Sequence, residues 1–279
     1  MKLAVAFVVL STLAIPSRTA GQTTEPDQTA PAGSPTSAPP QAPTPSSVPQ
    51  PSTTVDRPVS WKLLLPNLIS DQEHIWSFPT RLVQGQSWIP TAALLGTTAG
   101  LLALDPAEAA YFHRTLTFQR FNNIFTGNAT VIGTIAAPTS LYVVGLFRKD
   151  AKMRRTALLA GEAVADAEIL TTFLKDATNR VRPAGIPAGG NFSDSWFESS
   201  GSRLRGSGSF PSGHTIAAFS VATVIARRYG NHRWVPYAAY GLAAAVGFSR
   251  LSLSAHFSSD VFMGAALGYV IGRFGVLRQ

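Results

Sequence analysis

The chain contains no cysteine, which excludes disulfide bonds and thiolate metal sites. Charge is also sparse, since only 14% of the 279 residues are charged whereas 45% are hydrophobic. A soluble domain normally carries more charge, so this balance predicts either a tightly packed helical bundle or a body partly embedded in lipid. The 15 acidic residues are outnumbered by 23 Lys and Arg, and the formal net charge of +8 suits an anionic partner. Nucleic acid, an acidic membrane surface and a phosphorylated substrate all fit that description.

The N-terminal segment has the layout of an export signal. Lys2 precedes an apolar stretch at 3–15, and small residues follow at 19–21. Residues 1–21 are therefore predicted to form a signal peptide or an uncleaved N-terminal anchor. Residues 22–58 hold half of the chain's 20 prolines and lack large apolar side chains, which predicts a disordered linker. One folded domain is expected at 59–279.

Six apolar segments without period-two alternation predict an all-α fold with about six core helices. They are Trp88 to Leu104, Ala129 to Phe147, Thr156 to Leu174, Thr215 to Ala226, Pro236 to Phe248 and Val261 to Phe274. Several are shorter than the roughly 20 residues that a membrane span needs, so a membrane-embedded bundle stays open. The third segment also carries Glu162, Asp166 and Glu168, which are unfavourable in lipid unless they face the bundle interior.

Two basic clusters, 148–155 and 227–233, bear on topology. The positive-inside rule would place both in the cytoplasm, which puts Lys175, His214 and His256 together on the outer face. Two earlier spans would then leave the linker inside the cell, in conflict with an export signal. Either one helix does not span, or the bundle is not transmembrane. Membrane association is the interpretation that we favour.

The first chemical motif is KDATNRVRP, residues 175–183. Lys175 and Arg182 are seven apart, which predicts that they share one helix face, two turns removed, before Pro183 ends the helix. Two cations directed at one place suit a phosphate group. The planar guanidinium of Arg182 can bind two of its oxygens.

The second motif is GSGSFPSGHT, residues 206–215, a glycine-rich loop that leads into a helix predicted to start near His214. Backbone N–H groups and the helix dipole at such a start favour an anion. Ser212 is expected to cap the helix or bind an anion oxygen, and Gly213 lets the main chain come close.

The third motif is SRLSLSAHFSSD, residues 249–260. His256 and Asp260 are four apart, which predicts that they are stacked on one helix face. If Asp260 accepts a hydrogen bond from Nδ1, Nε2 of His256 is left free as a nucleophile, and Arg250 adds a further phosphate ligand.

Each motif alone is also typical of ordinary structure: a solvated basic helix end, a flexible Gly/Ser turn and a structural His/Asp pair. Together they supply three cations, backbone donors, a nucleophile with its orienting acid and a second histidine. That is the set of groups that phosphoryl transfer requires.

The order Lys-six residues-Arg-Pro, Pro-Ser-Gly-His and Ser-Arg-five residues-His-three residues-Asp resembles the type 2 phosphatidic acid phosphatase (PAP2) superfamily. That superfamily includes bacterial class A acid phosphatases and vanadium haloperoxidases. The resemblance covers about 170–272 and implies that 59–279 is a PAP2-type phosphatase domain built as a helical bundle. It implies that His256 is the nucleophile that forms a phosphohistidine, that Asp260 orients it, and that His214 is the general acid. A general acid requires a pKa near the working pH. The implied phosphate ligands are Lys175, Arg182, Ser212, Gly213 and Arg250.

The resemblance implies no metal and no other cofactor, and vanadate is expected to inhibit. The predicted function is hydrolysis of a phosphomonoester or diphosphate, whether a lipid phosphate, an isoprenoid diphosphate or a small phosphate ester. We expect export to the cell envelope, an active site outside the cytoplasm, association with the membrane and no nucleic-acid partner.

Two alternatives stay open. One is a vanadate-dependent haloperoxidase, for which vanadate would be the cofactor, and the other is a non-catalytic envelope protein that binds anionic lipid or wall polymer. The loop 184–209 either covers the site or is a simple connector. His74, His113 and His232 match no motif and are assigned no role.

Overall fold

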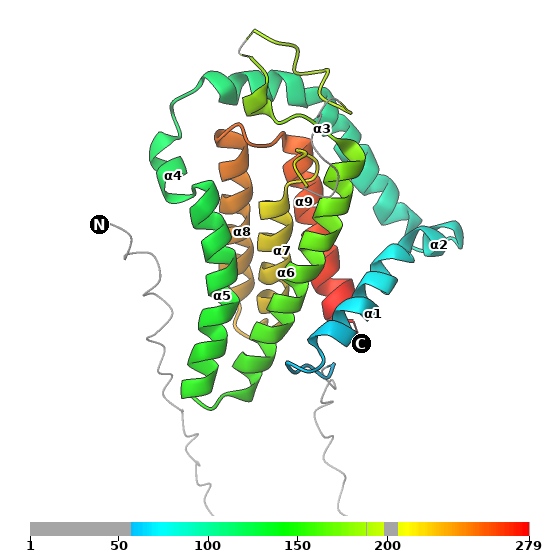
Figure 1. The fold of residues 1–279 in the computed structure, drawn as a ribbon, viewed down its shortest axis with the longest axis vertical. Coiled ribbons are helices and arrows are strands. Elements are labelled where there is room, and N and C mark those ends of the chain that lie inside the picture. Colours follow the sequence, from blue (N-terminus) through cyan, green and yellow to red (C-terminus); the bar gives the residue numbers. More distant parts are fainter. Residues whose placement is uncertain (1–56, 188, 198–205, 279) are drawn as a thin grey trace, which may run out of the picture. The chain divides into compact units, whose positions relative to one another are not determined.

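A computed structural model of the chain describes residues 57–187, 189–197 and 206–278. The predicted export segment 1–21 and residues 22–56 of the predicted linker lie outside these ranges. Within them the protein is all helical, so the predicted fold class is confirmed (Figure 1). The helices are α1 (Leu64–Trp76), α2 (Phe78–Val83), α3 (Trp88–Arg114), α4 (Gln119–Ile124), α5 (Gly127–Phe147), α6 (Ala151–Thr178), α7 (Gly213–Arg228), α8 (Trp234–Ser252) and α9 (Ser258–Val270).

Each of the six predicted segments corresponds to one long helix, α3 or one of α5 to α9. The last of these helices continues beyond Val270 as a π-helical turn, Ile271–Val276. The sequence did not predict α1, α2 or α4. Two of them, α2 and α4, have six residues each, which is too short for a helical period to show.

The core lies between α6 and α7, where small side chains let the two helices approach. Ala160 and Ala163 of α6 are fully buried, as are Ile216 and Val224 of α7. Close packing of this kind leaves little freedom for the helices to shift against each other. It therefore fixes the end of α6 relative to the start of α7.

Three glycines on one face of α9 and the turn that follows it, Gly264, Gly268 and Gly272, bring this helix against α7. A Cβ atom at Gly268 would lie only 2.4 Å from the carbonyl oxygen of Ile216. One at Gly264 would lie 2.9 Å from the carbonyl oxygen of Ser212. We call this contact the glycine seam. Because no side chain fits into it, it sets the spacing between α7 and α9.

A buried polar network holds α1 against α6. Arg57 binds both oxygens of Asp71, with Nη1–Oδ1 at 2.5 Å and Nη2–Oδ2 at 2.8 Å. Its Nη2 also donates to Glu162 of α6 over 2.8 Å. Glu162 and Asp166 are both buried, so they face the bundle interior as charges in such an apolar helix require, whereas Glu168 is exposed.

Two helices, α3 and α5, are long and apolar enough to cross a membrane, judged by length and composition alone. Only 11% of the most apolar stretch of α3 and 17% of that of α5 are buried inside the protein. Large apolar side chains such as Leu104, Ile132 and Phe147 are exposed on them. An extended apolar surface of this kind is typical of a face that contacts lipid or another protein.

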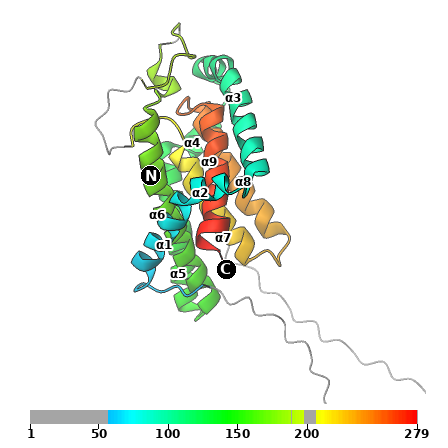
Figure 2. The ribbon, with the colours of Figure 1, turned by 90° about the vertical axis from the view of Figure 1, so that its right-hand side faces the viewer.

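Four helix ends gather at one end of the bundle: the C-terminal ends of α6 and α8 and the N-terminal ends of α7 and α9 (Figures 1 and 2). Lys152 and Arg155 lie at the other end of α6 and, with Arg227 and Arg228 of α7, line one cavity of about 600 Å³. Residues of both basic clusters therefore lie at the same end of the bundle, opposite to Lys175.

Candidate active site

The chain after α6 departs from the prediction. The helix ends at Thr178, because Asn179 adopts a left-handed conformation with φ of 41°. Arg182 then lies in extended backbone, as is usual before a proline. The prediction that Lys175 and Arg182 share one helix face is therefore wrong. The turn nevertheless brings the two side chains close. Burial is the main cause that lowers the pKa of Lys175 to about 8, and the nearby charge of Arg182 lowers it further.

His256 also lies outside the helix that was predicted for it, since α9 begins two residues later, at Ser258. The prediction of a pair stacked on one helix is wrong, yet Nδ1 of His256 lies 3.6 Å from Oδ2 of Asp260. Ser209 Oγ lies 3.3 Å from the same Nδ1 and donates to Oδ2 of Asp260 over 2.5 Å. A proton held on Nδ1 by these two groups leaves Nε2 unprotonated.

Asp260 is fully buried and still ionised. Burial opposes its charge, but the hydrogen bond with His256 and the guanidinium of Arg180 outweigh burial, and the pKa of the carboxyl is lowered from its ordinary value. For the imidazole, burial also disfavours the charged form, and it lowers the pKa of His256 to about 4 although Asp260 acts in the opposite direction. At neutral pH the pair is therefore a carboxylate beside a neutral imidazole.

Lys175, Arg182 and Arg250 bring positive charge to this pair. Lys175 and Arg182 both lower the pKa of His256 electrostatically, which shows that they lie near it. Arg250 is held by Ser249, whose Oγ accepts from Nε over 3.0 Å and from Nη2 over 2.7 Å. Toward the described residues, the side chains of Lys175 and Arg182 form no hydrogen bond, so both can bind an anion.

The glycine-rich loop enters α7 as predicted, with Ser212 as N-cap residue and Gly213 as the first helical residue. The side chain of Ser212 does not cap the helix, because its Oγ accepts a hydrogen bond from Thr215 Oγ1 over 2.9 Å. A Cβ atom on Gly213 would lie 3.6 Å from Nζ of Lys175. The start of α7, with its unpaired backbone N–H groups, therefore faces the lysine.

His214 lies in the first turn of α7, with Nε2 3.3 Å from the carbonyl oxygen of Gly127. Burial, followed by the charges of Arg250 and His256, lowers the pKa of His214 to about 4. The sequence-based expectation of a pKa near the working pH is not met in this site without an anion. The main reason is burial, to which the nearby charges of Arg250 and Lys175 add.

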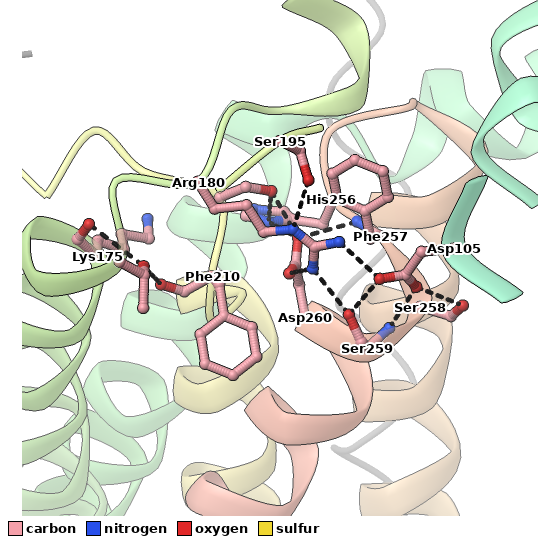
Figure 3. A network of polar contacts seen from close by, with 12 residues as sticks. Asp105, Lys175, Arg180, Ser195, Phe210, His256, Phe257, Ser258, Ser259 and Asp260 are labelled. Carbon is pink, nitrogen blue, oxygen red and sulfur yellow. Dashed lines mark hydrogen bonds and ion pairs between the residues drawn. The ribbon is translucent and has the colours of Figure 1, made fainter. Parts of the chain in front are cut away.

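Three residues that sequence reasoning missed complete the site: Asp105, Arg180 and Ser209. Figure 3 shows Asp105 and Arg180 beside Asp260. Arg180 is buried and donates to Asp260 Oδ1 over 2.5 Å and to Asp105 Oδ2 over 2.6 Å. One signal was present in the sequence, because Asp105 directly follows an apolar run and a charge there calls for a buried partner. Arg180 lies in the same motif, but Lys175 and Arg182 already accounted for a phosphate site there, so no role was assigned to Arg180.

The remaining histidines stay apart from this cluster. His74 contacts Arg81, His113 makes an edge-to-face contact with Phe192 with ring centroids 5.9 Å apart, and His232 is exposed. In the part of the chain that the structure describes, no group of three or more His, Asp or Glu residues is placed to hold a metal ion. From the described part of the predicted loop 184–209, Ser195 and Trp196 contact Arg180.

The geometry defines a class of protein: a helical bundle that carries a carboxylate-held histidine beside a second histidine and three cations. Residues 156–278 match the family model described as "PAP2 superfamily", and this range contains all eight predicted site residues. The resemblance seen in the motifs is thereby confirmed, and this segment is a PAP2 superfamily segment.

Two similar proteins give context. A lipid A 1-phosphatase of Porphyromonas gingivalis is 42% identical over 78 residues, which are 26% of this chain and 18% of that protein. The chain thus spans less than a fifth of that relative's length. A crystal structure of a transmembrane PAP2-type phosphatidylglycerolphosphate phosphatase from Bacillus subtilis is 21% identical, with a TM-score of 0.44 over 66% of this chain and 92% of the other.

Proposed function

We propose that the protein is a metal-independent PAP2-type phosphatase that hydrolyses a phosphomonoester or diphosphate through a phosphohistidine on His256. The observation that carries this proposal is the buried pair of His256 and Asp260, with Nδ1 and Oδ2 3.6 Å apart, beside three cations. A neutral imidazole whose Nδ1 is held has a free electron pair on Nε2, which is what attack on phosphorus needs.

In the proposed first step, Nε2 of His256 attacks phosphorus and the bond from phosphorus to the leaving oxygen breaks. His214 gives its proton to that oxygen. Water then attacks the phosphohistidine while His214 takes one of its protons, and the P–N bond breaks to release phosphate. Lys175, Arg182 and Arg250, with Ser212 and the backbone of Gly213, hold the phosphate oxygens throughout and stabilise their charge.

The low pKa of His214 fits this sequence once a substrate is bound. A phosphate dianion among the three cations offsets their effect on the imidazole, so binding raises the pKa of His214 and protonates it. Protonated His214, the general acid, is thereby formed when the substrate and its leaving group bind. Attack by an unprotonated His256 and protonation by His214 then occur in one complex.

The first experiment is hydrolysis of p-nitrophenyl phosphate by purified protein. His256→Ala should abolish turnover, whereas His232→Ala, which changes an exposed histidine away from the site, should not. Unchanged turnover in His256→Ala would disprove the mechanism. A wild-type protein that binds phosphate without turning it over would instead favour the non-catalytic envelope protein.

A lipid phosphate is the substrate class that we propose. The exposed apolar faces of α3 and α5 and the similarity to a lipid A 1-phosphatase support it. Purified protein should be compared on phosphatidic acid, undecaprenyl diphosphate and small phosphate esters, with detergent extraction recorded during purification. Higher kcat/KM on a small ester than on either lipid would contradict the lipid assignment.

The haloperoxidase alternative is tested with vanadate, which inhibits a phosphatase and activates a peroxidase. We further propose that segment 1–21 directs export and that 22–58 is a linker to the phosphatase domain at 59–279. The active site then lies outside the cytoplasm, in the cell envelope.

A further inference from the structure

We infer that Asp105 and Arg180 are positioning residues that set the orientation and charge of Asp260 and, through it, the reactivity of His256. This inference rests on the proposed function, because it concerns the same histidine. Neither residue belongs to the three sequence motifs as catalytic or phosphate-binding groups. Both are buried, with 1% and 2% of their surface exposed.

Arg180 donates most of its hydrogen bonds within the protein, so we assign it no role as a phosphate ligand. Its Nη1 donates to Asp260 Oδ1 over 2.5 Å and to Ser259 Oγ over 2.8 Å. Its Nη2 donates to Asp105 Oδ2 over 2.6 Å, and its Nε donates to Ser195 Oγ over 3.2 Å. Four of its five N–H groups are thus used within the network.

Two aromatic rings hold the guanidinium in place. The ring of Phe257 lies 3.9 Å from its carbon atom and that of Trp196 lies 4.4 Å from it. A planar cation can stack on a ring while its edge donates hydrogen bonds, which an ammonium group cannot do. The site therefore selects arginine at position 180 by shape as well as by charge.

The two oxygens of the Asp260 carboxylate have different partners. Oδ1 is taken by Arg180, whereas Oδ2 accepts from Ser209 and from the backbone N–H of Phe257 and lies 3.6 Å from Nδ1 of His256. With Oδ1 fixed, the carboxylate cannot rotate away from the imidazole. Arg180 thereby fixes the acceptor that holds the proton of Nδ1.

Asp105 is needed because Arg180 alone would neutralise Asp260. One guanidinium beside one carboxylate is a neutral pair, which would leave little negative potential for the imidazole. With Asp105 as a second carboxylate, the group of three carries one net negative charge close to His256. In a buried site such a charge acts strongly on its neighbour.

Asp105 also connects this network to the first turn of α9. Its Oδ1 accepts the backbone N–H of Ser259 over 3.1 Å, and its Oδ2 accepts Ser259 Oγ over 2.5 Å. A side chain of α3 therefore satisfies a backbone donor in the first turn of α9, the helix that carries Asp260 (Figure 3). The apolar helix α3 is in this way connected, through Arg180 and Asp260, to the candidate nucleophile.

The test compares Asp105→Asn with Glu108→Gln in hydrolysis assays across pH. Glu108 lies on the same helix and accepts a hydrogen bond from Ser258 N over 3.1 Å, but it contacts neither Arg180 nor Asp260. We expect Asp105→Asn to lower kcat by about 10- to 100-fold with KM within threefold, because the phosphate ligands are untouched. The acidic limb of the kcat/KM profile should move to lower pH, since less negative charge supports a protonated His256. Glu108→Gln should change neither quantity.

Arg180→Lys supplies a second readout that does not depend on Asp105→Asn folding. It keeps the charge and loses the stacked, forked contact, so kcat should fall at least tenfold while the acidic limb stays near its wild-type position. Wild-type kcat and an unshifted limb in folded Asp105→Asn, or wild-type kcat in Arg180→Lys, would overturn the inference. Loss of activity in His256→Ala together with those results would leave the phosphatase proposal standing. An inactive wild type would overturn both.

Discussion

The backbone N–H of Ser212 donates to the carbonyl oxygen of Asp260 over 3.1 Å. This single bond joins the N-cap residue of α7 to a residue in the first turn of α9. His214 follows Ser212 by two positions and His256 precedes Asp260 by four, so the bond links the two segments that carry the candidate catalytic histidines. A main-chain contact thus helps to fix these segments relative to each other.

Asp260→Asn should lower kcat by roughly 10²–10⁴-fold, because an amide cannot hold the imidazole in the same tautomer or stabilise its positive charge. KM should change little. Asp194→Asn is the matched control, since Asp194 is exposed and lies outside the site. Steady-state kinetics on p-nitrophenyl phosphate measures both variants, and equal kcat values for the two would contradict the role of Asp260.

The pH dependence should show two limbs in kcat/KM. Lys175 has a pKa of about 8, so it is charged below that pH and loses its attraction for phosphate as the pH rises through it. His256 has a pKa of about 4, so the nucleophile becomes protonated and unreactive as the pH falls through that value. Lys175→Arg should shift the alkaline limb to higher pH and leave the acidic limb in place. If the alkaline limb of Lys175→Arg lies at the wild-type pH, a group other than Lys175 causes it.

Gly268→Ala should destabilise the protein by about 1–3 kcal/mol, because the new Cβ would lie 2.4 Å from the carbonyl oxygen of Ile216 and 2.8 Å from Cβ of Phe219. Gly241→Ala is the control on α8, where no atom lies within 4 Å of the new Cβ. There the substitution should be neutral or stabilise by up to about 1 kcal/mol. Unfolding in detergent gives both values. Equal stability of the two variants would argue against the glycine seam.

Arg57→Ala should destabilise the protein by about 3 kcal/mol, because it leaves Asp71 and Glu162 as buried carboxylates that lose their main partner. Limited proteolysis should then cut α1 faster, since this network holds α1 to α6. The control is Lys62→Ala, which removes an exposed cation nearby. If Arg57→Ala and Lys62→Ala are cut at the same rate, the network does not hold α1.

The absence of cysteine gives a direct test of sidedness. Ser193→Cys places one thiol in an exposed loop at the site end, and Lys152→Cys places one at the opposite end of α6. In intact cells, a maleimide that does not cross membranes should label Ser193→Cys and not Lys152→Cys. Broken cells should show labelling of both. The reverse pattern in intact cells would place the active site in the cytoplasm.

The sequence predicted the six long helices, because apolar segments are local patterns, and its spaced motifs supplied eight candidate site residues. The sequence failed to predict where two helices end or begin, because a single backbone angle can determine such a boundary. Asn179 turns left-handed after α6, and α9 starts after His256, so two pairs expected on helix faces come together through loops instead. Spacing of four or seven residues predicts proximity on a helix only if the helix continues.

Arg180 and Asp105 were beyond sequence reasoning for a different reason. They are 75 positions apart and meet because α3 and the segment after α6 both lie against the start of α9. No local pattern records such a contact. What the sequence did hold was a carboxylate at the edge of an apolar run, which predicts a buried partner without naming it.

The glycine seam has a consequence for how this protein can change. Where a glycine face lies against the backbone and the Cβ atoms of a neighbouring helix, few rotamers can rearrange to accept a larger side chain. The distance between the two imidazoles is consequently insulated from substitutions in the surrounding bundle. The exposed apolar residues of α3 and α5 lie outside this contact, so they can be replaced while the atoms that act on the phosphate keep their spacing. Substitutions should therefore be tolerated on those faces and not at Gly264, Gly268 and Gly272.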